Sequence, residues 1–386
     1  MKEVTRFLKK WNLKGASIAV VKDERLVYAH GFGIADKEYN EVQPGSLFRV
    51  ASVSKLITAI GIMHLVEEGK INLDDKVFGP DAILNNPVFN EVRDKRLYKI
   101  TVRELLSHSA GWSQRFGDPA FIPLKIAELV QDEAPATMYS YYKFVANRRL
   151  SYYPGTRYAY SNMGYMFLAD IISSVSGESY ESYIKENIFI PNGIFDMHIG
   201  SSFQNHKRFN EVNYWVGEEN DTVPCFDGSG VFVSKANGGN SIELLGSAGG
   251  WICSAVELAK LITLVDGQSS VPDILTPESI NEMTSNISTQ GPLGWRSIYN
   301  NGDWVRTGSM AGTIATIKRM KNGYTWIFLS NSSNWKGNKL ERNINYLMTT
   351  IIKKTKSWPD QDLFNYFMTE EVSLANIESN VFNFNT

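Results

Sequence analysis

The sequence contains few of the residues that support disulfide or metal chemistry. Its 386 residues include only two cysteines, Cys225 and Cys253, and five histidines. Two cysteines outside a Cys-x-x-Cys pair cannot build a disulfide scaffold, and we expect two buried free thiols in preference to a disulfide between them. The histidines are dispersed, with no His-x-x-x-His spacing, so the sequence predicts no metal site and no cofactor.

Long apolar runs and an excess of charge of either sign are also missing. No stretch approaches the roughly 20 apolar residues of a membrane-spanning helix, and Met1 to Lys10 alternates charged with apolar residues instead of forming a signal-peptide core. We expect no integral membrane segment, with a periplasmic or otherwise exported location if a signal was removed and a cytoplasmic one otherwise. The net charge of -2 and the scattered basic residues argue against nucleic acid as a partner.

The composition is that of a folded globular protein. Apolar residues make up 43% of the chain and charged residues 21%, close to the usual averages. A single hydrophobic core stops growing at about 250–300 residues. A chain of 386 residues is therefore expected to form one large domain or two lobes that share a core.

Both ends of the chain are predicted to form strands. Ala16 to Val21 and Arg25 to Gly31 are β-rich runs joined by two polar residues, which is typical of a hairpin. Gly312 to Met320 and Tyr324 to Asn331 flank an Asn-Gly pair, the strongest short hairpin signal. Each end of the chain therefore contributes a strand pair.

The region between the strand pairs is predicted to be mostly helical. Ser52 to Glu68 carries apolar residues at helical spacing and is followed by Gly69, a residue suited to a helix C-terminus. A short amphipathic helix is expected at the N-terminus. Similar spacing predicts further helices at Val102 to Ser107, Met163 to Ser176, Tyr180 to Asn187, Ala255 to Leu264 and Asn338 to Lys353.

These elements predict an α+β fold, an α/β sandwich whose antiparallel sheet of about five strands is built from both chain ends and flanked by helices. We expect the sheet lobe to comprise residues 1–64 and 290–354, and an inserted, mostly helical lobe to comprise residues 65–289, with a pocket between the lobes. Residues 355–386 have weak periodicity and form a C-terminal extension, either an extra docked segment or a flexible end.

A serine and a lysine stand three residues apart at the start of the central predicted helix, at Ser52 and Lys55. This spacing places the hydroxyl and the amine on one face of the helix. Backbone N–H groups of a first helical turn lack partners, so the Ser52 N–H is available to a developing oxyanion. Lysine acts as a base for such a nucleophile only where burial or nearby cations lower its pKa. The Gly-x-Ser-x-Gly elbow of α/β-hydrolases is absent.

The Ser-x-x-Lys spacing is common by itself. Ser140, Ser182 and Ser333 also precede a lysine by three residues, and such a pair usually marks a solvent-exposed helix face. Five segments in one order distinguish Ser52, since ordered matches are far more specific than any single one. They are Phe48-Arg49-Val50-Ala51-Ser52-Val53-Ser54-Lys55, Leu105-Leu106-Ser107-His108-Ser109-Ala110-Gly111, Pro154-Gly155-Thr156-Arg157-Tyr158-Ala159-Tyr160-Ser161-Asn162, Ser247-Ala248-Gly249-Gly250-Trp251 and Arg306-Thr307-Gly308-Ser309.

Together these segments resemble the serine beta-lactamase and penicillin-binding protein family, in its class C beta-lactamase-like branch with related D,D-peptidases and esterases. The resemblance covers roughly residues 10 to 350. It implies a beta-lactamase/transpeptidase-like fold and an enzyme that forms an acyl-enzyme on a small amide or ester. By the same resemblance, Ser52 is the nucleophile, and Lys55 and Tyr160 form its proton relay.

The resemblance also implies the substrate-binding residues. Asn162 would orient a substrate amide carbonyl, and the segment Arg306, Thr307, Gly308 and Ser309 would line the cleft. The backbone N–H groups of Ser52 and Ser309 would form the oxyanion hole. His108 is expected to support its loop, not to act as a base.

Arg306 departs from the family pattern, in which this position is usually lysine or histidine. Arginine keeps the positive charge and can bind a carboxylate through two hydrogen bonds, but it does not deprotonate and so cannot shuttle protons. Alternatively, Arg306 pairs with an acidic group and holds the strand.

Two classes of function stay open at this point. The leading hypothesis is acyl transfer to water with a small-molecule or short-peptide substrate. We rank peptidoglycan-type peptides and other small amides or esters above a beta-lactam, because fast deacylation cannot be inferred from motifs. The alternative is a penicillin-binding or sensing protein that acylates without efficient turnover. The oligomeric state is left open.

Overall fold

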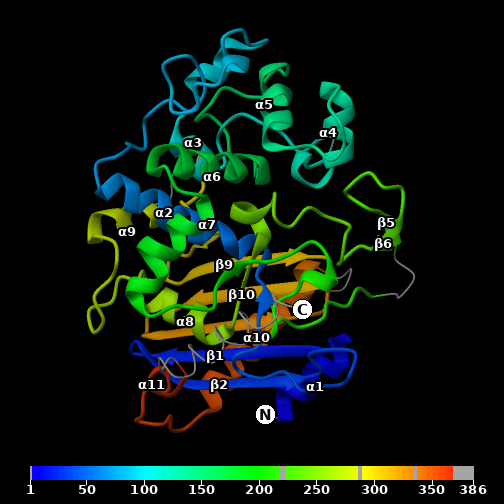
Figure 1. Ribbon diagram of the computed structural model, residues 1–386. Coiled ribbons are helices and arrows are strands. Elements are labelled where there is room, and N and C mark those ends of the chain that lie inside the picture. Colours follow the sequence, from blue (N-terminus) through cyan, green and yellow to red (C-terminus); the bar gives the residue numbers. More distant parts are fainter. Residues whose placement is uncertain (1, 116, 218–221, 286–288, 334–336, 368–386) are drawn as a thin grey trace.

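The computed structural model of the chain describes residues 2–115, 117–217, 222–285, 289–333 and 337–367. Its main feature is an antiparallel sheet of six strands in the order β2-β1-β11-β10-β9-β8. Two strands from the start of the chain thus lie beside strands from its end (Figure 1). The strands are β1 (Gly15–Lys22), β2 (Arg25–Gly33), β8 (Ser297–Ile298), β9 (Trp304–Met310), β10 (Thr313–Arg319) and β11 (Tyr324–Ser330).

The predicted α+β fold and the joining of the two chain ends are confirmed. Strands β1 and β11 pair antiparallel, with Ile18 opposite Phe328. The sheet has six strands instead of about five because the two-residue β8 pairs with β9 at the edge. Two residues are too few to show a period of two, so the sequence pattern did not reveal this strand.

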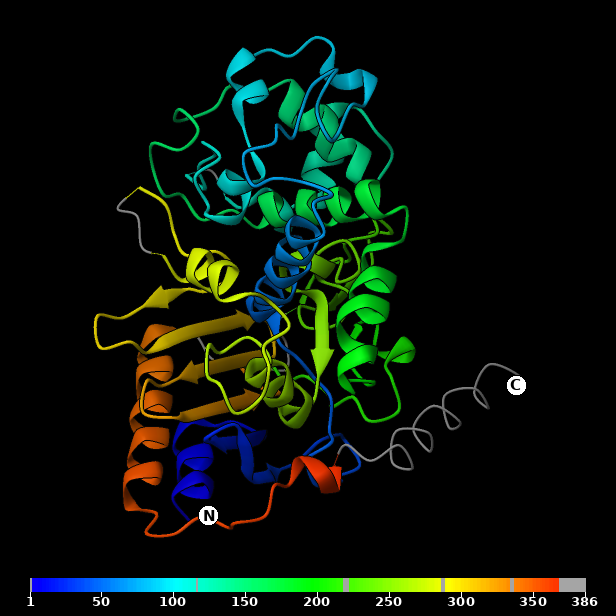
Figure 2. The ribbon, with the colours of Figure 1, turned by 90° about the vertical axis from the view of Figure 1, so that its left-hand side faces the viewer.

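Helices cover both faces of this sheet. On one face, α1 (Lys2–Trp11) and α10 (Gly337–Lys354) share a core with Ile18 and Phe328. On the other face, α8 (Ala255–Thr263) packs against β1 and β11. The side chains that alternate with Ile18 and Phe328 along these strands point toward this face. Figure 2 shows α10 and α1 on the outer side of the sheet. Strands buried on both faces read as continuous apolar runs, as β11 does.

The central helix lies between the sheet and the upper, mostly helical part (Figure 1). A 3-10 turn, Ala51–Val53, leads into α2 (Ser54–Glu67), in place of the single helix predicted from Ser52. The remaining helices are α3 (Val102–Leu106), α4 (Pro123–Val130), α5 (Met138–Ala146), α6 (Asn162–Ser176), α7 (Tyr180–Ile184), α9 (Pro277–Thr284) and α11 (Phe364–Phe367).

Two small sheets complete the fold. One has the order β3-β7-β4 and the other pairs β5 with β6. Their strands are β3 (Phe48–Arg49), β4 (His198–Ile199), β5 (Thr222–Pro224), β6 (Phe232–Ser234) and β7 (Trp251–Cys253). The pairing of β3 with β7 immediately precedes the turn into α2, so it fixes the chain just before Ser52.

The first part of the predicted extension is docked on the sheet lobe. The Leu363 N–H donates to the Leu26 carbonyl at 2.9 Å, and the Leu26 N–H donates to Asp362 Oδ1 at 3.0 Å. Residues 368–386 lie outside the described residues. Cys225 and Cys253 are both buried free thiols, as predicted. Among the described helices, none has the length and apolar character needed to cross a membrane.

Candidate active site

Ser52 lies in a tight turn held by neighbouring strands. The Val50 N–H donates to the Trp251 carbonyl at 3.0 Å, which extends the pairing of β3 with β7 by one residue. Ala51 then takes a φ of +47°, a left-handed conformation that is costly for a residue with a side chain. Ser52 follows in the 3-10 turn that leads directly into α2, and it is half-buried. A strained residue beside a candidate nucleophile fits a functional turn.

Lys55 lies on the first turn of α2 and is completely buried. Its amine donates three hydrogen bonds: to Ser52 Oγ at 3.3 Å, to Asn162 Oδ1 at 2.6 Å and to the Ala248 carbonyl at 2.5 Å. Three acceptors match the three N–H groups of a protonated lysine. The amine is therefore held in one position beside the Ser52 hydroxyl.

Tyr160 completes the contacts of Ser52. Its phenol donates to Ser52 Oγ at 2.9 Å, and its ring centroid lies 5.0 Å from Lys55 Nζ. Tyr160 precedes Ser161, whose hydroxyl accepts from the Gly164 N–H and caps α6. The cap defines where α6 begins, so Tyr160 lies just before the first turn of the helix.

Both members of this relay have pKa values shifted toward neutral pH. Burial and, less strongly, the charge of Arg306 lower the pKa of Lys55 to about 8, against the opposing effect of Tyr160. Burial raises the pKa of Tyr160, but the positive charges of Lys55 and Arg306 outweigh this effect and bring that pKa down to about 8. Two groups in contact with near-equal pKa values exchange a proton at little cost.

His108 packs behind the relay. It is buried, its ring centroid lies 4.3 Å from that of Tyr160, and its Nδ1 accepts from the Ser161 N–H at 3.2 Å. Burial, together with the charges of Lys55 and Arg306, holds the pKa of His108 well below its usual range. A neutral histidine bonded to the backbone fits the predicted supporting role.

Asn162 faces Lys55 at one end of its amide and an unpredicted carboxylate at the other. Its Nδ2 donates to Asp118 Oδ2 at 2.5 Å, while its Oδ1 accepts from Lys55. Asp118 also accepts from Gln114 Nε2 at 2.6 Å and from the Ala120 N–H at 3.1 Å. One of the two Asn162 N–H groups is therefore committed within the protein, and the contact of the second with a substrate carbonyl stays a prediction.

Arg306 is buried, with an exposed fraction of 2%, and turns toward the nucleophile's backbone. Its Nε donates to the Ser52 carbonyl at 2.7 Å, and its Nη2 donates to the same oxygen. Two of the guanidinium N–H groups thus bind this carbonyl, and the contact of Arg306 with a substrate carboxylate stays a prediction. The predicted alternative of an acidic partner is not the observed contact, since the acceptor is a backbone oxygen.

The strand that carries Arg306 presents an open edge to the site. The Val305 carbonyl accepts from the Arg296 N–H, which precedes β8, at 3.0 Å. Backbone groups of a strand alternate in direction, so the N–H of Ser309 points the same way as those groups, beyond the end of β8. Gly308 lies against the nucleophile turn, where an added Cβ would be 2.3 Å from the Val50 carbonyl oxygen. This approach requires glycine.

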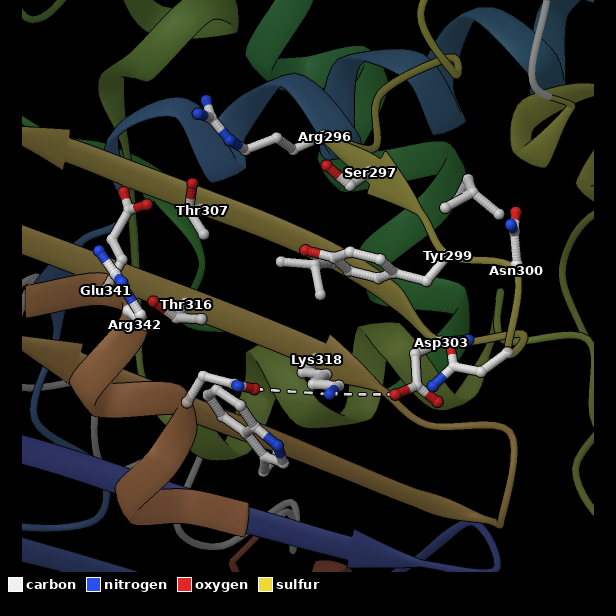
Figure 3. Close-up of a pocket in the computed structure, with 15 residues that line it drawn as sticks. Arg296, Ser297, Tyr299, Asn300, Asp303, Thr307, Thr316, Lys318, Glu341 and Arg342 are labelled. Atoms are coloured by element: carbon white, nitrogen blue, oxygen red, sulfur yellow. Dashed lines mark hydrogen bonds and ion pairs between the residues drawn. The ribbon is translucent and has the colours of Figure 1, made fainter. Parts of the chain in front are cut away.

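The side chain of Thr307 points away from Ser52. It lines a cavity of about 730 Å³ between the sheet and α10. Figure 3 shows it there with Thr316 of the next strand, near Glu341 of α10. Alternate side chains of a strand face opposite sides of a sheet, so the substrate contact of Thr307 stays a prediction for its backbone groups only.

A cavity of about 440 Å³ opens beside the relay and includes Asp118 and Tyr160. A second cavity, of about 490 Å³, includes Ser309. Ile122 and Lys125 line both, so the loop before α4 and its first turn separate them.

The sequence reasoning missed Asp118 and the carbonyl of Ala248. Asp118 stands before Pro119, a pattern that predicts a helix N-cap, and it does cap the 3-10 turn Pro119–Phe121. No local signal indicates its contact with Asn162, 44 residues away. Within the described residues, no group of three or more acidic, histidine or cysteine side chains is placed to bind a metal ion.

Comparison with known proteins agrees with the family resemblance of the sequence motifs. Residues 2–349 match the family model described as Beta-lactamase. A penicillin-binding protein of Bacillus subtilis (strain 168) is 34% identical over 194 residues, which are 49% of this chain and 39% of that protein. The chain therefore spans well under two thirds of that relative.

Solved structures share the fold. D-amino acid amidase from Ochrobactrum anthropi SV3, in complex with D-phenylalanine, aligns with a TM-score of 0.69 at 20% identity over 92% of this chain and 99% of that one. D-alanine carboxypeptidase AmpC from Burkholderia cenocepacia aligns with a TM-score of 0.65 at 16% identity over 91% and 97%. At these identities the likeness establishes the architecture.

Proposed function

Because the chain belongs to the beta-lactamase family, we propose that it is a serine hydrolase that forms an acyl-enzyme on Ser52 with Lys55 and Tyr160 as its proton relay. The observation that carries the proposal is the convergence on one hydroxyl. Ser52 Oγ lies 2.9 Å from the Tyr160 phenol oxygen and 3.3 Å from the Lys55 amine, both of lowered pKa. This chemistry requires a nucleophile in contact with a base whose pKa lies near the working pH.

Acylation begins when the relay has lost one proton. Ser52 Oγ attacks the substrate carbonyl carbon as its proton passes to Tyr160 or Lys55. The carbonyl oxygen becomes an oxyanion, for which the backbone N–H groups of Ser52 and Ser309 are the proposed donors. The relay then returns the proton to the leaving nitrogen or oxygen as its bond to the carbonyl carbon breaks.

Deacylation repeats these steps with water. Water gives a proton to the relay and attacks the acyl carbon, and Ser52 Oγ takes the proton back as the ester bond breaks. The positive charges of Lys55 and Arg306 favour the deprotonated form of the Tyr160 phenol. Because Arg306 cannot release a proton, its role here is electrostatic.

The proposed substrate is a small amide or ester with an acyl group on one side of the scissile bond and a leaving group on the other. The cavity lined by Tyr160 and the cavity lined by Ser309 support a substrate with two such arms. A D-amino-acid-containing peptide or amide is our first choice, on the names of a carboxypeptidase and an amidase that share the fold. An ester or a beta-lactam ranks below it.

Mass spectrometry tests the proposal directly. The chain is incubated with a D-Ala-D-Ala peptide, D-phenylalanine amide, a p-nitrophenyl ester and penicillin, and both product and protein mass are followed. We expect turnover of at least one substrate and its loss, by a factor of at least about 1,000, in Ser52→Ala. Turnover by Ser52→Ala at the wild-type rate would falsify the proposal.

The same experiment separates the alternative function. A single stoichiometric burst, followed by a lasting adduct on Ser52, identifies a penicillin-binding or sensing protein that does not turn over. Arg306 in place of a proton-transferring residue is the feature that favours this alternative. Steady turnover excludes it.

The pH dependence follows from the two pKa values. Below pH 8 both Lys55 and Tyr160 hold their protons, and Ser52 has no acceptor for its own. We therefore expect kcat/KM to rise about tenfold per pH unit below about pH 8 and to level off above it. A profile that is flat from pH 6 to pH 9 would exclude this pair as the base.

A further inference from the structure

Asp118 is a carboxylate that joins the relay through another side chain, that of Asn162. It lies in the loop between α3 and α4, half-buried, and lines the cavity that holds Tyr160. Its Oδ2 accepts from Asn162 Nδ2 at 2.5 Å, and Asn162 Oδ1 accepts from Lys55 at 2.6 Å. The three groups form a continuous hydrogen-bonded chain.

This chain has a fixed direction. The two ends of an asparagine amide have nearly the same shape, so hydrogen bonding alone decides which end faces a neighbour. A carboxylate accepts and does not donate, so Asp118 binds the NH₂ end. The oxygen end of Asn162 is thereby left facing the Lys55 amine.

The position of Asp118 is itself secured on two other sides. Gln114 Nε2 donates to its Oδ2 at 2.6 Å and the Ala120 N–H donates to its Oδ1 at 3.1 Å. The second bond caps the 3-10 turn Pro119–Phe121. The carboxylate is therefore held independently of Asn162 and can act as its anchor.

We propose that Asp118 is a positioning residue for the relay: by holding the Asn162 amide in one orientation, it keeps an acceptor against the Lys55 amine. The inference rests on the proposed function. Lys55 has its three donors on Ser52, Asn162 and Ala248. A reversed amide would point an N–H group at the amine and release it from its place beside Ser52.

The charged groups around Lys55 set the direction of a pH effect. Tyr160 and Asp118 favour the protonated amine, whereas Arg306 opposes it and His108 is neutral. Removing the charge of Asp118 therefore lowers the pKa of Lys55. The low-pH limb of kcat/KM then moves to lower pH.

The test compares Asp118→Asn with Asp170→Asn. Asp170 is a matched control because, like Asp118, it is a half-buried carboxylate, and it accepts from the Tyr142 phenol instead of a residue of the relay. For Asp118→Asn we expect kcat to fall about tenfold or more, since misplaced catalytic groups cost this much, with KM changed less than twofold and the low-pH limb displaced downward. For Asp170→Asn we expect the wild-type profile.

Asp118→Glu and a double-mutant cycle distinguish a loss of positioning from a folding defect. Asp118→Glu keeps the charge, so its low-pH limb should return toward the wild-type position. In an Asn162→Ala background, Asp118→Asn should cost kcat less than twofold more, because the residue it acts through is gone. Thermal unfolding of every variant is measured alongside.

Three results would overturn the inference. They are a wild-type kcat and profile in Asp118→Asn, a profile in Asp118→Glu that matches Asp118→Asn, and full additivity with Asn162→Ala. None of these affects the assignment of Ser52, which fails only if Ser52→Ala remains active.

Discussion

At the scale of single residues, the site gathers two cations and a phenol around one hydroxyl. Lys55 is fully buried and Arg306 nearly so, and burying two like charges together is unfavourable unless hydrogen bonds compensate. The three acceptors of Lys55 and the Ser52 carbonyl on Arg306 supply this compensation. The result is a lysine whose pKa lies near 8, within reach of neutral pH.

Replacing Arg306 by methionine tests its electrostatic role. The substitution removes a charge that lowers the pKa of both Lys55 and Tyr160, so both pKa values rise. We expect the low-pH limb of kcat/KM to move to higher pH, opposite to the shift in Asp118→Asn. Arg306→Lys, which keeps the charge, should leave the limb near its wild-type position. A limb unmoved in Arg306→Met would refute this role.

At the scale of elements, the site depends on how closely β9 approaches the turn before α2. Gly308 faces that turn, and a Cβ at this position would lie 2.3 Å from the Val50 carbonyl oxygen and 2.9 Å from the Ser52 nitrogen. Neither neighbour is a flexible side chain. The strand therefore has to move if the glycine is replaced, and Ser309 moves with it.

Gly308→Ala is expected to lower kcat/KM by about 100-fold, the cost of a displacement of roughly 1 Å between a nucleophile and its oxyanion donor. Gly45→Ala serves as the control, since a Cβ there meets nothing within 4 Å. Ester or amide hydrolysis and thermal unfolding are measured for both. Equal activity in the two variants would contradict the close approach of β9.

At the scale of the whole molecule, the described part of the C-terminal extension packs against the sheet lobe. Phe364 is buried, and Lys260 Nζ of α8 lies 5.3 Å from its ring centroid. Asp362 and Leu363 bond to the Leu26 backbone on β2. These contacts join the last described residues to the first hairpin, away from Ser52.

We therefore expect Phe364→Ala to lower the free energy of unfolding by about 3 kcal/mol, the usual cost of removing a buried ring. Activity at 25 °C should stay within twofold of wild type. Tyr366→Ala is the control, because this ring is largely exposed. Denaturant midpoints measure both, and equal midpoints in the two variants would show that the extension adds no stability.

The sequence by itself determined the features that depend on local spacing. Strand pairs at both ends follow from β-rich runs around tight turns, and the central helix follows from apolar periodicity. Ser52 and Lys55 are three residues apart, across the 3-10 turn and the first turn of α2, so local helical geometry brings them together. The resemblance carried by the ordered motifs added Tyr160 and Asn162.

Only the tertiary structure decided the features that depend on which face or edge a residue occupies. Arg306 carries a charge whose partner no spacing predicts, and folding places it on the Ser52 carbonyl. Thr307 is turned to the opposite face of the sheet, and Asp118 meets Asn162 across 44 residues. Spacing fixes neighbours within a helix or strand, whereas contacts between elements depend on packing, which no short segment encodes.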